Sequence, residues 1–94
     1  MKIDGIIWLE DIVEKLERKH SVDRAEVKEV FNNSPRFRFV EKGHRRGENV
    51  YSAAGKTDAG RHLIIFFVLK KGNRALVLSA RESTSSERKR HGKK

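Results

Sequence analysis

The stretch Leu63–Ile64–Ile65–Phe66–Phe67–Val68–Leu69 decides the fold, because it is an unbroken apolar run rich in β-branched and aromatic side chains. Such a run is typical of a central strand covered on both faces, and it is far shorter than the roughly 20 residues that a membrane helix needs. Turn-forming residues follow at 71–73, and the apolar pattern resumes over 75–80. The sequence therefore predicts a β-hairpin over 62–80 whose first strand is the core of a sheet.

Two further strands are expected on the N-terminal side of this hairpin. In the range 36–40 the two phenylalanines alternate with Arg36 and Arg38, so the phenylalanines project to one face of a strand and the arginines to the other. A basic turn over 42–47 follows, and 50–56 is expected to be the pairing strand. The four predicted strands follow one another as an antiparallel meander.

A short strand and two helices are predicted before the meander. The strand covers 6–8, and apolar residues then recur at helical spacing over 10–20. Asp23 with Glu26 three residues later forms the pattern of a capping box, which begins a second helix. That helix is expected to end before Pro35, whose ring removes a hydrogen-bond donor.

The chain after the meander predicts a short polar helix. Thr84 and Glu87 have the spacing of a second capping box, and the helix is expected to run to about His91. The resulting order of elements is that of an α+β fold. The 94 residues fit one domain, taken as 1–91, followed by a basic tail at 92–94.

The positive charge is concentrated in the C-terminal two-thirds of the chain. The net charge is +9; through Pro35 there are six Lys and Arg against eight Asp and Glu, whereas the remainder has sixteen against five, a net charge of +11. The positive charge attracts polyanions, so nucleic acid is the favoured partner, with an acidic protein or a membrane surface as the alternatives. Basic residues that only keep the protein soluble remain a third interpretation.

Several classes of site are excluded by residues that the chain lacks. It has no cysteine, and the spacing of its four histidines fits no metal site. It also lacks the motifs of nucleotide loops, hydrolase elbows and zinc proteases. We therefore expect no metal and no cofactor. Without a membrane-length apolar run or a signal peptide, we also expect no membrane association and a cytoplasmic protein.

Arg81, Glu87 and His91 are the first candidates for chemistry. Arg81 comes at the end of a predicted strand, where its guanidinium could bind a phosphate through two parallel hydrogen bonds. Glu87 and His91 lie four residues apart on one helix face and could transfer protons beside that phosphate. The structural alternative is an Arg81 paired with Glu82 or Glu87 and a solvated helix face.

Other residues could extend the site. Lys56 and Arg61 flank the turn before the central strand, and are expected to lie near each other and to widen the basic surface. Arg36 and Arg38, with Arg45 and Arg46, form another basic set for which phosphate contact and simple solvation are equally open. Arg88 flanks Glu87 on the terminal helix. Trp8 could stack on a base, although a lone tryptophan beside Ile6 and Ile7 is more often part of the core.

Several short segments occur together in a characteristic order along nearly the whole chain. The most specific segment is the strand end Ser79–Ala80–Arg81 before a Thr-x-x-Glu-Arg helix. The others are Trp8, Lys19–His20–Ser21–Val22 before Glu26, Val30–Phe31, and Gly55–Lys56–Thr57 with Gly60–Arg61. In this order and spacing they resemble the BrnT toxin family.

This resemblance implies a bacterial type II toxin of RelE-like fold. It implies an endoribonuclease that cuts RNA without metal and inhibits translation, and that is silenced by a ribbon-helix-helix antitoxin of the BrnA kind. Operator DNA would be bound only through the toxin–antitoxin complex. In such a site Arg81 and Lys56 would hold the phosphate, Arg61 would support them, and Glu87 or His91 would transfer protons, with Arg88, Arg36, Arg38 and Trp8 on the substrate.

The chain departs from the family pattern at three positions. Ser21 replaces a frequent glycine, which costs a favourable helix end. Lys56 replaces a common arginine, which keeps the charge but loses the planar fork. His91 replaces a common tyrosine, which leaves the chemistry of that position open. A nucleic-acid-binding module without catalysis and a toxin that poisons gyrase by protein binding remain the alternatives, because the fold alone does not set the function.

Overall fold

The computed structural model describes residues 1–43 and 48–92, with only the backbone for 90–92. The predicted basic turn therefore falls largely outside the described residues, as does most of the tail. The described elements confirm an α+β fold and are, in chain order, β1 (Gly5–Ile7), α1 (Glu10–His20), α2 (Arg24–Asn32), β2 (Arg36–Glu41), β3 (Val50–Lys56), β4 (His62–Lys70), β5 (Arg74–Glu82) and α3 (Ser85–Gly92).

The strands form one mixed sheet in the order β1-β5-β4-β3-β2. Strands β2 to β5 make the expected antiparallel meander, and β4 is the central strand, as its apolar run predicts. Strand β1 pairs in parallel with β5 and adds a fifth strand at the edge. The prediction that Trp8 belongs to the first strand is wrong, because that strand ends at Ile7 before the chain turns into α1.

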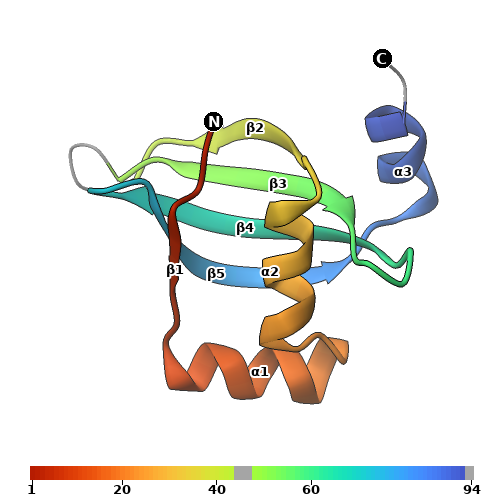
Figure 1. Ribbon diagram of the computed structural model, residues 1–94, viewed down its shortest axis with the longest axis horizontal. Helices are drawn as coiled ribbons and strands as arrows, with labels where there is room; N and C mark the ends of the chain where they lie inside the picture. The colour runs from red at the N-terminus through yellow and green to blue at the C-terminus, as the bar shows by residue number, and fades with distance from the viewer. Residues whose placement is uncertain (44–47, 93–94) are drawn as a thin grey trace.

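Helices α1 and α2 lie on the same face of the sheet (Figure 1). Helix α1 packs against β5, and α2 packs against β3 and β4. From β4, alternate residues Leu63, Ile65 and Phe67 point to this face and are fully buried. The Phe67 ring makes edge contacts with Phe31 of α2 and Phe37 of β2. The hydrophobic core therefore lies between the sheet and the two helices, and burial of these side chains is the main source of stability.

The junction between the two helices is set by local sequence. At the start of α2 the Asp23 carboxylate accepts a 2.8 Å hydrogen bond from the Glu26 N–H, and Glu26 Oε1 accepts from the Asp23 N–H, which confirms the predicted capping box. At the end of α1, Ser21 has φ 52° in the left-handed region. Glycine adopts this conformation without steric cost, whereas a serine side chain strains this helix end.

Helix α3 lies beyond the end of β5 (Figure 1). Its sequence contains no apolar residue, so it cannot be held by burial of a hydrophobic face. The predicted capping box is present, because Glu87 N–H donates to Thr84 Oγ1 at 3.1 Å and Thr84 N–H donates to Glu87 Oε1 at 2.8 Å. The position of α3 therefore depends on polar contacts at its first turn.

Candidate nucleic-acid interface

We call the face of the sheet opposite α1 and α2 the open face. It carries a group of basic side chains. Directly paired residues on neighbouring strands project to the same side of a sheet. The register therefore places the predicted site residues Arg36, Arg38, Lys56 and Arg81 together on this face. Its cross-strand rows are Lys56–His62, then Arg36–Ala54–Ile64–Arg81, then Arg38–Ser52–Phe66–Ser79.

A cavity of about 730 Å³ opens at one end of this face. The cavity is bounded by the end of β3, the beginnings of β2 and β4, and α3. It brings together three predicted site residues, Arg36, Lys56 and Arg88. Its remaining lining residues are Asn33, Ser34, Pro35, Ala54, Gly55, Thr57, Asp58, His62 and Ser83.

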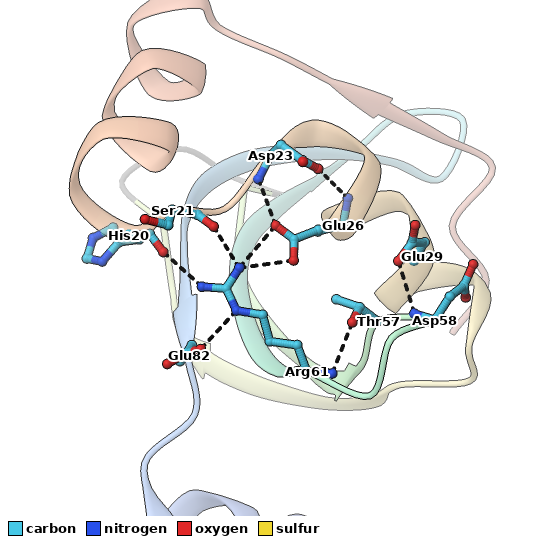
Figure 2. Close-up of polar contacts among 9 residues, drawn as sticks. All are labelled: His20, Ser21, Asp23, Glu26, Glu29, Thr57, Asp58, Arg61 and Glu82. Carbon is cyan, nitrogen blue, oxygen red and sulfur yellow. Dashed lines mark hydrogen bonds and ion pairs between the residues drawn. The ribbon is translucent and has the colours of Figure 1, made fainter.

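The rim of this cavity is tied to α2. Asn33 Nδ2 donates to the carbonyl oxygen of Lys56 and to Asp58 Oδ1, both at 2.9 Å. The N–H of Asp58 donates to Glu29 Oε1 at 3.0 Å (Figure 2). These bonds hold the turn after β3 in place, so the backbone that carries Lys56 is fixed before any ligand binds.

Three exposed cations of the open face are available to a ligand. Within the described part of the chain, the side chains of Arg36, Arg38 and Lys56 form no hydrogen bond or ion pair. In the same part of the chain, Arg88 makes only a 3.4 Å contact from its guanidinium to Ser85 Oγ. An unpaired cation can contact a phosphate without first breaking an internal bond, so this cluster suits the backbone of a nucleic acid.

Arg81 differs from these cations because it is paired. Its Nη1 and Nη2 donate to the two carboxylate oxygens of Glu87 at 2.8 and 3.0 Å, and Nη1 also donates to the Glu82 carbonyl at 3.1 Å. The guanidinium lies 5.8 Å from the centre of the Phe66 ring. The bonds to Glu87 match the structural alternative for Arg81, yet they leave Nε–H and one Nη2–H without a partner in the described chain.

Glu87 is held firmly in its charged form. The hydrogen bond from Arg81 lowers its pKa to about 2, with a further contribution from the Thr84 N–H. The same hydrogen bond, opposed in part by burial, raises the pKa of Arg81. A carboxylate with this pKa accepts protons poorly near neutral pH, so its visible role is to orient Arg81 and to fasten α3 to the end of β5.

Arg61 lies on the other face of the sheet, away from Lys56. Its side chain extends toward the junction of α1 and α2, where Nη1 binds the Glu26 carboxylate at 3.0 Å and the Ser21 carbonyl at 2.6 Å (Figure 2). Nη2 donates to the His20 carbonyl at 3.0 Å, and Nε donates to Glu82 at 2.9 Å. The bond to Glu82 is the largest cause of the raised pKa of Arg61. The structure therefore does not bring Arg61 into the basic cluster.

Trp8 is another predicted site residue that is separate from the cavity. Trp8 is half-buried, packs against the core, and lines a second cavity with Phe31, Arg24 and Lys28 between β1 and α2. The side chain of His91 lies outside the described residues. Arg45 and Arg46, in the basic turn, also lie outside them.

The residue that sequence reasoning missed is His62. It is the cross-strand partner of Lys56 and lines the same cavity. The predicted turn contained the signal for His62. The Thr57 N–H donates a hydrogen bond to the Arg61 carbonyl, and a turn closed in this way places His62 opposite Lys56. Arg61, one residue earlier, projects to the opposite face because side chains alternate along a strand.

Within residues 1–43 and 48–92, no cluster of three or more histidine, aspartate or glutamate side chains could hold a metal ion. In the same ranges, no helix is long and apolar enough to cross a membrane.

The family assignment rests on a match over most of the chain. Residues 8–87 match the family model described as the ribonuclease toxin, BrnT, of type II toxin–antitoxin systems. The chain belongs to the BrnT toxin family. No curated protein matches the chain. The BrnT family acts on RNA and is paired with a protein antitoxin, and the α+β architecture described above is broadly that of a RelE-like toxin.

Proposed function

We propose that the open face binds single-stranded RNA and that cleavage takes place at the cavity end of this face, beside Arg81. The observation that carries the proposal is the contrast among its cations. Arg36, Arg38 and Lys56 have no partner within the described residues, whereas Arg81 is held in a fixed orientation by Glu87. The free cations supply affinity for the RNA backbone. The oriented guanidinium supplies a fixed donor for one particular phosphate.

The proposed reaction needs no metal ion. The 2′-hydroxyl of the ribose attacks the adjacent phosphate, the negative charge on the phosphorane is stabilised by Arg81 and Lys56, and the 5′-oxygen leaves. Arg81 can take part while still bound to Glu87, because Nε–H and the second Nη2–H form a free edge of the guanidinium. DNA lacks the attacking hydroxyl, so restriction to RNA follows from the same chemistry.

In this proposal Glu87 is a positioning residue. Its two oxygens are occupied by Arg81 and by the Thr84 N–H, and its low pKa makes it a weak proton acceptor. Arg61 is assigned to the stability of the helix junction and not to the substrate. Arg88 joins the phosphate contacts from α3, and His91 stays a candidate for proton transfer from the sequence alone.

The wider biology is proposed from the family. The toxin acts in the cytoplasm, and RNA cleavage inhibits translation. A ribbon-helix-helix antitoxin of the BrnA kind neutralises it, and the complex binds operator DNA. We take 1–91 as the folding unit and 92–94 as a basic tail.

The test measures RNA cleavage and RNA affinity side by side. Single-turnover cleavage is followed in EDTA for the wild type, Arg81→Ala and Arg81→Lys, with Arg18→Ala as a control because Arg18 is exposed on α1. Arg81→Ala should lower the cleavage rate by about 100-fold or more. Its RNA affinity should change little, because one cation among several is lost, and the slope of log affinity against log salt concentration should fall by roughly one unit. Arg81→Lys should rescue poorly, because an ammonium cannot form a two-point contact.

Several outcomes would contradict the proposal. RNA binding without cleavage by the wild type would indicate a binding module. Intact RNA with damaged DNA in cells would indicate a gyrase poison. Cleavage that stops in EDTA and returns with Mg²⁺ would show that a metal is required. Equal losses of cleavage and affinity in Arg81→Ala would reduce Arg81 to an ordinary phosphate contact.

A further inference from the structure

Among the predicted site residues whose side chains the structure describes, the proposed site lacks an evident proton acceptor. Attack by a 2′-hydroxyl requires a group that removes its proton. Glu87 is an unsuitable base, because both of its oxygens already accept hydrogen bonds from Arg81 and one also accepts from the Thr84 N–H. Lysine and arginine side chains are protonated near neutral pH and cannot accept a proton. The base must therefore come from another residue.

His62 is placed where such a group is needed. It begins β4, is the direct cross-strand partner of Lys56, and lines the cavity together with Arg36 and Arg88. The next row of the open face ends in Arg81, because Ile64, two residues after His62, pairs with Arg81. His62 therefore lies on the same face as the arginine that would hold the scissile phosphate, one cross-strand row away.

The imidazole of His62 is also available. Within the described chain its ring nitrogens form no hydrogen bond or ion pair, and the side chain is half-buried. The charged groups that line the cavity with His62 are Lys56 of β3, Asp58 of the turn between β3 and β4, Arg36 of β2 and Arg88 of α3. Asp58 is already engaged, since its carboxylate accepts from Asn33. An imidazole that is unpaired in the described chain and lies among cations able to contact phosphate is available for proton transfer.

We propose that His62 is the general base of RNA cleavage in this protein, an inference that rests on the ribonuclease site proposed above. The imidazole takes the proton of the 2′-hydroxyl, a bond forms between O2′ and phosphorus, and the bond from phosphorus to O5′ breaks. The departing 5′-oxygen takes a proton from water, and the imidazolium later returns its proton to the solvent. The products are a 2′,3′-cyclic phosphate and a 5′-hydroxyl end.

The experiment compares His62→Gln with a matched histidine variant, His20→Gln, in the full chain. The His20 side chain lies at the end of α1, and only its backbone carbonyl is used by Arg61. Affinity is measured on the same RNA with a 2′-O-methyl group at the cleavage position, which binds but cannot react. His62→Gln should cut about 100-fold more slowly at pH 7 with nearly unchanged affinity, whereas His20→Gln should behave as the wild type.

The pH dependence separates a chemical role from a structural one. The wild-type rate should rise with pH and then level off, as expected for a general base, and this rise should be absent in His62→Gln. A substrate with sulfur at the bridging 5′ position has a leaving group that needs no proton. If His62 is the base, His62→Gln should therefore still cleave this substrate slowly. If this substrate restores the rate of His62→Gln, His62 is the acid and the proposal is wrong.

The failure of this inference is distinct from the failure of the proposed function. If the wild type cuts RNA and His62→Gln cuts equally fast with the same pH profile, only the assignment of His62 is overturned. If the wild type cuts no RNA, both are overturned. A melting curve for each variant shows that a slow variant is folded, and His62→Ala, judged by the same pH profile, provides a second substitution if glutamine unfolds the protein.

Discussion

Removing the Arg61 guanidinium should destabilise the protein without changing the chemistry of the folded fraction. The side chain is 23% exposed and joins three elements: the end of α1, the first turn of α2 and the end of β5. Arg61→Met keeps most of the aliphatic stem and removes only the donors. The substitution therefore isolates the polar contacts that Figure 2 shows.

The size of the effect follows from the individual contacts. The bond to Glu82 contributes little, on the order of 0–1 kcal/mol, since Glu82 is 64% exposed and solvent screens the pair. The two carbonyl bonds, to His20 and Ser21, contribute about 1 kcal/mol each, because these groups at the end of α1 lose their partner. The bidentate contact with the part-buried Glu26 adds about 1 kcal/mol. The expected loss is therefore about 3–4 kcal/mol.

This loss is large for a chain of this size, whose total stability is of the order of 5–15 kcal/mol. Urea unfolding with a linear extrapolation measures it, and the melting temperature should fall by roughly 12–32 °C. Arg18→Met is the control, because Arg18 is exposed on α1, and it should change stability by less than about 0.5 kcal/mol. RNA affinity per folded molecule should stay that of the wild type.

Two results would refute this reasoning. A loss of less than about 1 kcal/mol would mean that solvent replaces the guanidinium at little cost. Wild-type stability combined with weakened RNA binding would place Arg61 on the substrate, as the sequence alone suggested.

Four other outcomes are expected. Ser21→Gly should stabilise the protein by about 1 kcal/mol in urea unfolding, because φ 52° is strained for serine; a neutral or destabilising result would contradict this. Glu87 has a pKa of about 2 in the folded protein, below its ordinary 4.5, so its contribution to folding stability is complete above about pH 4.5 and is lost toward pH 2. The amides of α3 should therefore lose protection from hydrogen exchange between pH 4.5 and 2, and Glu87→Gln should show no such transition. Amides of β4 should exchange more slowly than those of the edge strand β2, and equal rates would contradict the central position of β4. Expression of the wild type alone should arrest growth and translation, with recovery when its antitoxin is co-expressed; unaffected growth with soluble, folded protein would argue against an active toxin.

The elements that the sequence predicted well are those with strong local signals. The limits of α1 match, because one apolar stripe defines the helix, and both capping boxes form as their spacing indicates. The alternation in β2 correctly placed Arg36 and Arg38 on one face. These features depend on residues within a few positions of one another, so sequence alone is sufficient to define them.

The site was harder to predict because it depends on register across the sheet. The sequence placed Lys56 and Arg61 near each other as neighbours across a turn, but the closed turn pairs Lys56 with His62. A difference of one residue reverses the face to which a strand side chain points. The sequence therefore predicted Arg61 as the neighbour of Lys56, one residue away from the actual partner, and His62 was overlooked. The partners of Arg61 on α1 and α2 are about 35 to 41 residues away and have no local signal.

Arg61 and Arg81 show why pairing with a carboxylate does not by itself decide what an arginine does. Both bind a glutamate through Nη1. Arg61 also uses Nε and Nη2 on protein groups, so no two adjacent donors remain for a phosphate. Arg81 keeps its Nε–H and one Nη2–H, the donor pair that matches two phosphate oxygens, and it does so on the face that carries the unpaired cations. The unused edge of the guanidinium, more than its charge, therefore distinguishes the arginine that can act on RNA from the one that holds the helices together.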